Sequence, residues 1–464
     1  MNKSNTSLDL EELTSLTPLD GRYRERLKEL APFVSEYALI KVRIEVEIKY
    51  LQSLSKVGVV RKLEPSEIKF LTSIYEDISF GDIREVKKIE QVTRHDVKAV
   101  ERMLRNKLTD TSLSDVIEKI HFGLTSEDIN NLSYRLMLFR GTQSVIIPKI
   151  KELLRVLTDL ADANKSLPML ARTHGQAAVT TTLGKELVIF ASRLSKQLDI
   201  LEKQKLTGKL NGAVGNFNAL SLTFPDIDWI FFSEEFVTSL GLIPNLITTQ
   251  INTYDDVSEY FQIIERINNI IIGFDQDMWR YISDGWFAQV VKKGEVGSST
   301  MPQKVNPIDF ENSEGNLGLA NSLLEYMARK LAISRLQRDL TDSTTIRNLS
   351  TVLSYSLIGY TSVLTGMTRV RPNEAAITDA LLKDWTILTE GVQTILRNAG
   401  VDDPYSLVSS LSRGQHIGQK EWVTWIETLP IGTSHKKLLA SLTPETYIGL
   451  AVQLTERAID EIRK

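Results

Sequence analysis

The stretch VSEYFQIIERINNIIIGFDQDMWRYI, residues 257–282, decides the fold that we predict for this chain. Its apolar residues recur every three or four positions, which is the period of one face of an α-helix. No proline lies between Pro244 and Pro302, so a helix of roughly 28 residues, about 42 Å long, can form here. Further apolar residues, such as Phe261 and Ile270, lie off the main face. We therefore expect this helix to be buried on several sides, inside a bundle or between subunits.

Three other segments show the same helical period. One starts at Ile146 and continues to Leu160, and Pro148 is tolerated in its opening turn. The second covers residues 183–201, and the third runs from about Ser343 to residue 357. Strand-like alternation is rare, and short apolar runs such as residues 288–291 are interpreted as small hairpins. The predicted fold class is all-α, mainly helical, with a central bundle of long helices.

The length of 464 residues indicates roughly three domains at about 150 residues each. The polar run at residues 109–112 and the segment 369–373, which contains Pro372, are the candidate boundaries. We predict an N-terminal helical domain over residues 1–112, a central long-helix bundle domain over residues 113–369 and a C-terminal helical domain over residues 370–464.

Composition excludes several classes of function. Basic residues number 55 and acidic residues 59, so the chain lacks the basic surface of a nucleic-acid-binding protein. The chain contains no cysteine, which excludes disulfides, thiolate catalysis and iron–sulfur ligation. The polar N-terminus lacks the apolar region of a signal peptide, and no apolar run approaches the roughly 20 residues of a membrane span. We expect a cytoplasmic protein without a membrane or nucleic-acid partner.

The sequence contains none of the common cofactor-binding motifs. The five histidines lack zincin spacing, and the run Gly212 to Gly215 follows no strand and has the wrong spacing for a dinucleotide fingerprint. No P-loop appears. We expect neither a metal nor a cofactor.

The stretch GSSTMPQKVNP, residues 297–307, is the most informative for chemistry. Glycine and two prolines keep it irregular, and Asn306 as N-cap with Pro307 at the first helical position starts a new helix. A hydroxyl, a lysine and the positive end of a helix converge there, which suits an anionic transition state. The alternative interpretation is an ordinary glycine-proline loop followed by a capped helix.

A second stretch, RTHGQ at residues 172–176, places His174 among polar neighbours before a helix that follows Thr181. Histidine is the usual acid or base near neutral pH, although a loop histidine is also often a plain surface residue.

Three helix starts are candidate anion sites. Residues 93–96 (TRHD) and 125–128 (TSED) fit a loose capping-box pattern, and Ser343 lies one turn before Arg347 on a helix that starts near Asp342. Capping alone explains the threonine, serine and aspartate residues. Arginine and histidine residues in or near these starts favour an additional role in binding phosphate.

Together these motifs resemble the fumarase/aspartase superfamily, whose signature G-S-S-x-M-P-x-K-x-N corresponds to residues 297–306. Within it the chain closely resembles the adenylosuccinate lyases over most of its length. The matching motifs are LTPLDGRY (16–23), RHDVKAVE (94–101), HFGLTSEDINN (121–131), RTHGQ (172–176), NPIDFENSEGN (306–316) and QRDLTDSTTIRN (337–348).

The resemblance implies a three-domain fumarase/aspartase-like fold, a homotetramer with active sites shared between subunits, and release of fumarate from a nucleotide substrate by β-elimination. It implies Ser298 as the base, His174 as the acid and Lys304 as the group that stabilises the intermediate, with Glu311, His95 and His121 in support. The substrate-binding residues that it implies are Arg22, Tyr23, Arg94, His95, Asp96, Thr125, Ser126, Gln250, Asn312, Arg338, Ser343, Thr344, Thr345, Ile346 and Arg347.

Two positions depart from the family pattern. Gln303 stands where many adenylosuccinate lyases have histidine, and a glutamine at this position resembles the pattern of argininosuccinate lyase. Arg94 occupies a place where a neutral residue such as asparagine is common in close relatives. The alternatives are therefore an argininosuccinate lyase or another fumarate-releasing lyase, and a non-catalytic helical scaffold with the same fold. Retention of Ser298, His174 and Lys304 together argues against the scaffold.

Overall fold

The computed structural model describes residues 11–290, 294, 300–412 and 417–464. These residues are mostly helical, and their strands form three two-stranded sheets. The predicted all-α fold class is confirmed. The chain divides into a first unit, Met1–Ile150 with Asp199–Asn268 and Gly315–Thr361, and a second unit, Lys151–Leu198 with Asn269–Glu314 and Ser362–Lys464. The three-domain division proposed from the sequence stays a prediction.

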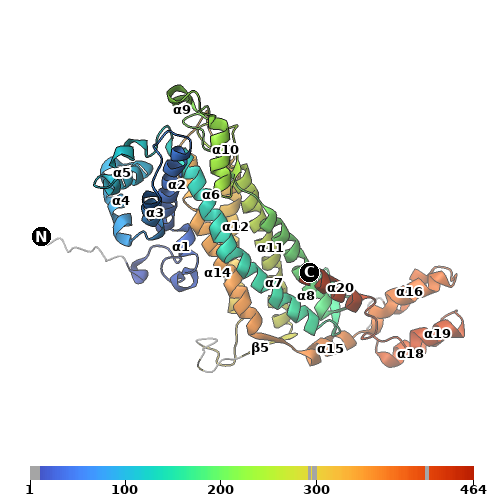
Figure 1. Cartoon of the computed structure of the whole chain (residues 1–464). Helices are drawn as coiled ribbons and strands as arrows, with labels where there is room; N and C mark the ends of the chain where they lie inside the picture. The colour runs from blue at the N-terminus through green and yellow to red at the C-terminus, as the bar shows by residue number, and fades with distance from the viewer. Residues whose placement is uncertain (1–10, 291–293, 295–299, 413–416) are drawn as a thin grey trace. The chain divides into compact units, whose positions relative to one another are not determined.

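The first unit contains most of the shorter N-terminal helices. In it α2 packs along α6 and α1, and α4 packs on α5, as the blue and cyan part of Figure 1 shows. A buried apolar face on α2 explains this packing, because Leu39, Ile44 and Leu51 are all at most 3% exposed. Its helices and strands are η1 Glu12–Thr14, η2 Arg24–Leu27, α1 Ala31–Val34, α2 Glu36–Lys56, α3 Pro65–Glu76, α4 Phe80–Thr93, α5 Asp96–Leu108, η3 Ser114–Lys119, α6 Ser126–Gly141, η4 Thr142–Ile146, β3 Thr207–Gly208, α9 Asn218–Thr223, α10 Trp229–Ser239, β4 Ile243–Pro244 and α13 Thr341–Ile346.

The second unit contains two antiparallel strand pairs and the C-terminal helices. Strand β1 pairs with β2, and β5 pairs with β6. Helix α16 packs on α17 and α18 on α19, the latter around the fully buried Trp422. Its elements are β1 Pro168–Thr173, β2 Gln176–Thr182, β5 Phe287–Gln289, β6 Val370–Pro372, α15 Glu374–Leu382, η5 Trp385–Leu388, α16 Thr389–Asn398, α17 Pro404–Ser412, α18 Gln419–Thr428, α19 Thr433–Ala440 and α20 Ala451–Arg463.

Five long helices have residues in both units: α7 Ile147–Ala163, α8 Leu183–Lys203, α11 Asp255–Ser283, α12 Ile308–Leu331 and α14 Leu349–Thr368. The predicted helices over 183–201 and 257–282 are confirmed as α8 and α11. The apolar stripe of α11 is buried, with Val257 and Phe274 at 2% and 3% exposure, and each such side chain contributes about 1.5–3 kcal/mol. No helix among the described residues is long and apolar enough to cross a membrane.

The predicted helix from Ile146 is confirmed as α7, with Pro148 in its first turn. The residues before it, η4, are π-helical. They join α6 directly to α7, so the chain stays helical on both sides of Pro148. Proline removes a backbone donor and crowds the carbonyl four residues earlier. A π-turn next to it is a common way for a long helix to accommodate such a defect.

Two sequence expectations about strands and helices were wrong. Residues 287–289, at the run expected to form a small hairpin, pair instead with the distant strand β6, so that Ala288 lies opposite Arg371. The helix expected from about Ser343 to residue 357 is divided into α13 and α14. The break follows from Asn348, whose side-chain amide donates to the backbone carbonyl of Thr344 and so competes with the helical hydrogen bonds.

The start of α12 lies one residue later than expected. The helix begins at Ile308, and the amide of Glu311 donates to the carbonyl of Pro307 at 3.3 Å. The residue whose carbonyl accepts the first helical bond is the N-cap. Pro307 therefore takes the cap position, and Asn306 precedes it.

Candidate active site

The start of α6 is fixed by a buried carboxylate. The Thr125 amide donates to Asp128 at 2.9 Å, so the predicted capping box is confirmed. Asp128 also pairs with Lys209 at 2.7 Å, and both side chains are fully buried. The backbone amides of Asn211 and Gly212 donate to the same carboxylate. This network gives the helix start, and with it Ser126, a rigid position.

The start of α5 is capped by histidine. We expected Thr93 to cap this helix with Asp96, and that expectation was wrong. Helix α4 continues through Thr93, Arg94 adopts the left-handed conformation with φ 51°, and the His95 ring accepts the Lys98 amide at 3.2 Å. A left-handed residue ends α4 and lets the chain turn directly into α5. The cap leaves the other ring nitrogen, Nε2, facing away from the helix.

Contacts between distant segments bring the helix starts together. His95 Nε2 lies 3.3 Å from the Ser126 hydroxyl, which joins the starts of α5 and α6. Asp96 pairs with Arg347 at 3.2 Å and with the buried Arg43 at 2.7 Å. Burial raises the pKa of Asp96, but the two guanidinium groups outweigh it, so the pKa lies below its usual value. Asp96 is therefore a fixed negative charge that holds Arg347 beside His95.

Arg338 belongs to the same unit and makes three polar contacts. Its guanidinium donates to Gln250 Oε1 at 3.3 Å and lies 3.4 Å from Glu127 and 3.9 Å from Asp342. Gln250 in turn donates to the carbonyl of Ala213. Because Glu127 follows Ser126 in the chain, Arg338 is held next to the cluster around His95.

His121 lies on a second buried carboxylate. Its Nδ1 is 2.6 Å from Glu47 Oε1, and the Glu47 side chain is fully buried on α2. Burial lowers the pKa of His121, but the charge and hydrogen bond of Glu47 outweigh it, so the net change is upward. His121 also adopts a left-handed backbone conformation, with φ 57°, which is rare for a residue with a side chain.

The remaining predicted residues of the first unit differ in exposure. The side chains of Thr345 and Ile346 are buried, whereas Thr344 and Arg347 are exposed. Arg22 and Arg94 are exposed, and Tyr23 contacts the guanidinium of Arg26. The roles of Arg22, Tyr23 and Arg94 stay predictions.

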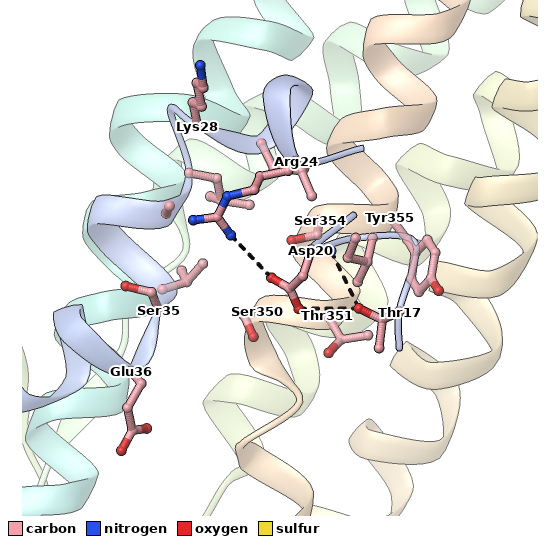
Figure 2. Close-up of a pocket in the computed structure, with 15 residues that line it drawn as sticks. Thr17, Asp20, Arg24, Lys28, Ser35, Glu36, Ser350, Thr351, Ser354 and Tyr355 are labelled. Carbon is pink, nitrogen blue, oxygen red and sulfur yellow. Dashed lines mark hydrogen bonds and ion pairs between the residues drawn. The ribbon is translucent and has the colours of Figure 1, made fainter. Parts of the chain in front are cut away.

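A cavity of about 470 Å³ also lies in the first unit, between the N-terminal segment and the start of α14. Figure 2 shows Asp20 among the residues that line it, in contact with Thr17 and Arg24. None of the predicted site residues lines it among those that the structure describes. The cavity is therefore distinct from the cluster of helix starts.

In the second unit, His174 lies at the tip of a β-hairpin rather than in a free loop. Thr173 pairs with Gln176, so only His174 and Gly175 form the turn. Both have positive φ, 54° and 74°, which is the pattern of the type I′ turn that suits the twist of antiparallel strands. The hairpin therefore presents an exposed imidazole at a defined position.

The other second-unit residues lie at and before the start of α12. Lys304 is exposed, and its amide closes a turn onto the carbonyl of Met301. Glu311 accepts a hydrogen bond from the Trp279 indole at 3.1 Å, and Asn312 donates to Ser362 at 2.7 Å. Ser298 lies outside the described residues. A lysine just before the positive end of a helix suits a developing anion.

Sequence reasoning missed the residues that hold the site. Glu47 and Arg43 are buried charges within the apolar helix α2, and charged residues within an apolar run were the available signal. Lys209 gave no signal, because its partner Asp128 is 81 residues away.

The cluster combines two positive helix ends, the His95 imidazole and two arginines held by carboxylates. Such a combination of donors suits an anionic group. In the described part of the chain no group of three or more His, Asp or Glu residues could hold a metal ion.

Comparisons with known proteins agree with this fold and chemistry. A model of the Lyase family matches residues 21–320, and a model of the adenylosuccinate lyase C-terminal region matches residues 334–448. Among solved structures the chain is similar in fold to a fumarate lyase from Mesorhizobium sp. BNC1, with a TM-score of 0.75, 14% identity and coverage of 93% of this chain and 97% of that one. The fold and the matched models define a lyase of the fumarase/aspartase superfamily.

Two curated relatives narrow the family. The chain is 45% identical to adenylosuccinate lyase of Haemophilus influenzae, over 97% of this chain and 100% of the relative. It is 43% identical to adenylosuccinate lyase of Escherichia coli, over 98% of this chain and 100% of the relative. The chain belongs to the adenylosuccinate lyase family.

Proposed function

We propose that this enzyme eliminates fumarate from adenylosuccinate, giving AMP, and from the succinylated aminoimidazole carboxamide ribonucleotide, giving AICAR, in purine biosynthesis. The observation that carries the proposal is the convergence of the α5 and α6 starts with Arg347 and Arg338 in one unit. A nucleotide with a phosphate and a dicarboxylate needs several fixed cationic donors. Argininosuccinate has no phosphate and would leave part of this set unused.

The reaction assigns a role to each catalytic group. Ser298 removes a proton from the succinyl carbon, the electron pair of that C–H bond becomes the double bond of fumarate, and the C–N bond breaks. His174 gives a proton to the departing nitrogen. A hydrogen beside a carboxylate is weakly acidic, so Lys304 and the start of α12 stabilise the anion that forms. Glu311, His95 and His121 support these groups.

The substrate-binding set follows the family motifs. The first unit supplies groups for the phosphoribosyl and succinyl parts from the starts of α5 and α6, from α13 and its C-cap, and from the segment before α13. Asn312 adds one group from α12. The proposed set is Arg22, Tyr23, Arg94, His95, Asp96, Thr125, Ser126, Gln250, Asn312, Arg338, Ser343, Thr344, Thr345, Ile346 and Arg347.

The assembly that we propose is a cytoplasmic homotetramer whose active sites are shared between subunits. Exposed apolar residues on the long helices support it, because Trp279 on α11 and Leu319 and Tyr326 on α12 are 45%, 53% and 52% exposed in the single chain. Such side chains on a bundle helix are typical of a subunit interface. Light scattering of the purified protein should give four times the chain mass.

A fumarate-release assay with purified enzyme tests the function. Adenylosuccinate and argininosuccinate are supplied in parallel, and we expect release from adenylosuccinate alone. Ser298→Ala and His174→Ala should each lower turnover on the order of 10²- to 10⁴-fold. Activity only with argininosuccinate would refute the substrate assignment, and no activity with either would support the scaffold interpretation.

A further inference from the structure

Arg338 lies between two buried carboxylates. Its side chain is 18% exposed, while those of Glu127 and Asp342 are 2% and 4% exposed. The two acids come from different elements, α6 and α13, and both lie within 4 Å of the same guanidinium. One cation therefore faces two acids, so that one buried negative charge is left without a matching cation when both acids are ionised.

Other cations near Glu127 are engaged elsewhere. Arg135 pairs with Asp256 at 3.0 Å, and Lys209 pairs with Asp128 at 2.7 Å. Within the described residues Glu127 Oε1 accepts no hydrogen bond. The charged or titratable groups that face Glu127 and Asp342 are Arg135, Lys209, Tyr254, Lys330, Arg338 and Asp339.

Burial favours a proton on this pair of acids. Burial first, and then the Asp342 charge, raise the pKa of Glu127 to about 7, against the opposing effect of Arg338. Burial also raises the pKa of Asp342, again opposed by Arg338. Near neutral pH, Glu127 therefore exists in both protonation states.

We infer that Glu127 and Asp342 are positioning residues that aim the Arg338 guanidinium at an anionic group of the substrate, and that the proton on Glu127 controls how tightly Arg338 binds that group. The inference rests on the proposed function, which assigns Arg338 to the substrate. Gln250 completes the support by its hydrogen bond from Arg338 and its own bond to the carbonyl of Ala213. Arg338 is thereby held by three neighbours while 18% of its side chain stays exposed.

The charges give the direction of the effect. With Glu127 protonated and Asp342 ionised, the group of three has no net charge. With Glu127 ionised it carries one negative charge, which opposes a second anion beside Arg338. Binding of the substrate anion is therefore linked to uptake of one proton by Glu127 from solvent. Affinity should fall as the pH rises through the Glu127 transition.

The test compares Glu127→Gln with the native enzyme. Glutamine keeps the shape and an acceptor for Arg338 but cannot titrate. KM for adenylosuccinate is measured from about pH 6 to pH 8.5, a window centred on the Glu127 transition. In the native enzyme KM should rise by up to about tenfold per pH unit above neutrality, the limit for one linked proton. In Glu127→Gln this rise should disappear, and the change in KM should exceed the change in kcat.

Two controls separate this effect from others. The substrate phosphate also titrates, near pH 6, but its contribution is the same in both enzymes. Glu461 is the matched control residue, because it lies 3.2 Å from Arg457 with a 62% exposed side chain. Glu461→Gln should keep the native pH profile. A Glu127→Gln enzyme with the native rise in KM would overturn the inference.

Asp342→Asn and Arg338→Gln distinguish the inference from the proposed function. Arg338→Gln should raise KM at least about tenfold, as expected on removal of a charge-assisted contact. An unchanged KM in Arg338→Gln would refute the substrate assignment itself. A raised KM in Arg338→Gln, together with unchanged KM values and pH profiles in Glu127→Gln and Asp342→Asn, would refute only the positioning role.

Discussion

Replacing Asp128 by asparagine should destabilise the enzyme strongly. The carboxylate pairs with Lys209 at 2.7 Å and accepts three backbone amides, from Thr125, Asn211 and Gly212. Both charged side chains are fully buried. In the variant the Lys209 ammonium loses its anionic partner, and the Gly212 carbonyl, at 2.8 Å, remains as an uncharged acceptor. Breaking a buried ion pair by removing one partner costs about 3–5 kcal/mol. We expect a loss of that size in the free energy of unfolding.

A double-mutant cycle measures this coupling. Asp128→Asn, Lys209→Met and the double variant are unfolded by urea at one fixed protein concentration, because assembly also contributes to stability. The loss in the double variant should be smaller than the sum of the single losses by about 2 kcal/mol, since it leaves no unpaired ammonium. Additivity within about 0.5 kcal/mol would refute the view that this pair holds the start of α6.

Three further predictions concern single residues. Because asparagine tolerates positive φ, His174→Asn should keep the native unfolding midpoint while turnover falls on the order of 10²-fold or more; native turnover would remove His174 from the mechanism. Since the pKa of His121 is raised beside Glu47, the stability that this ion pair contributes is complete below about pH 6.5 and is lost as pH rises through the folded pKa. The difference in unfolding free energy between native enzyme and Glu47→Gln should therefore shrink between about pH 6 and pH 9; a difference that grew with pH would show that the pair is not ionic. A Cβ on Gly184 would lie 2.4 Å from the carbonyl oxygen of Ala161, so Gly184→Ala should lower thermal stability by about 1–3 kcal/mol. The control Gly273→Ala, with its nearest neighbour at an ordinary 3.6 Å, should not, and equal losses would exclude the clash as the cause.

Local periodicity predicted the long helices well. The predictions of α8 and α11 were confirmed. They were possible because the spacing of apolar residues every three or four positions can be read within a single segment. The capping box at Thr125 was confirmed for the same reason. The hairpin around His174 was not predicted, since its two-residue turn lacks the Asn-Gly or Asp-Gly pair that usually marks such a turn.

Local sequence patterns could not predict the contacts between segments that are distant in the chain. Strand β5 pairs with β6 about 80 residues later in the chain, and no turn signal between them marks that pairing. The motif residues of the candidate site could be recognised in the sequence. The supporting roles of the buried groups Glu47, Glu127 and Lys209 could not, because those roles depend on tertiary packing. The break at Asn348 likewise depends on a side-chain bond that competes with the helix.

We propose that catalysis depends on the Ser298 hydroxyl taking a proton while the His174 imidazole gives one. The most direct measurement is an experimental structure of the assembled enzyme with adenylosuccinate bound. Ser298 Oγ should then lie beside the proton-bearing succinyl carbon, and an imidazole nitrogen of His174 should lie about 2.6–3.2 Å from the departing nitrogen or reach it through one water. The claim would be contradicted if the two side chains were far apart around the bound substrate in every combination of subunits.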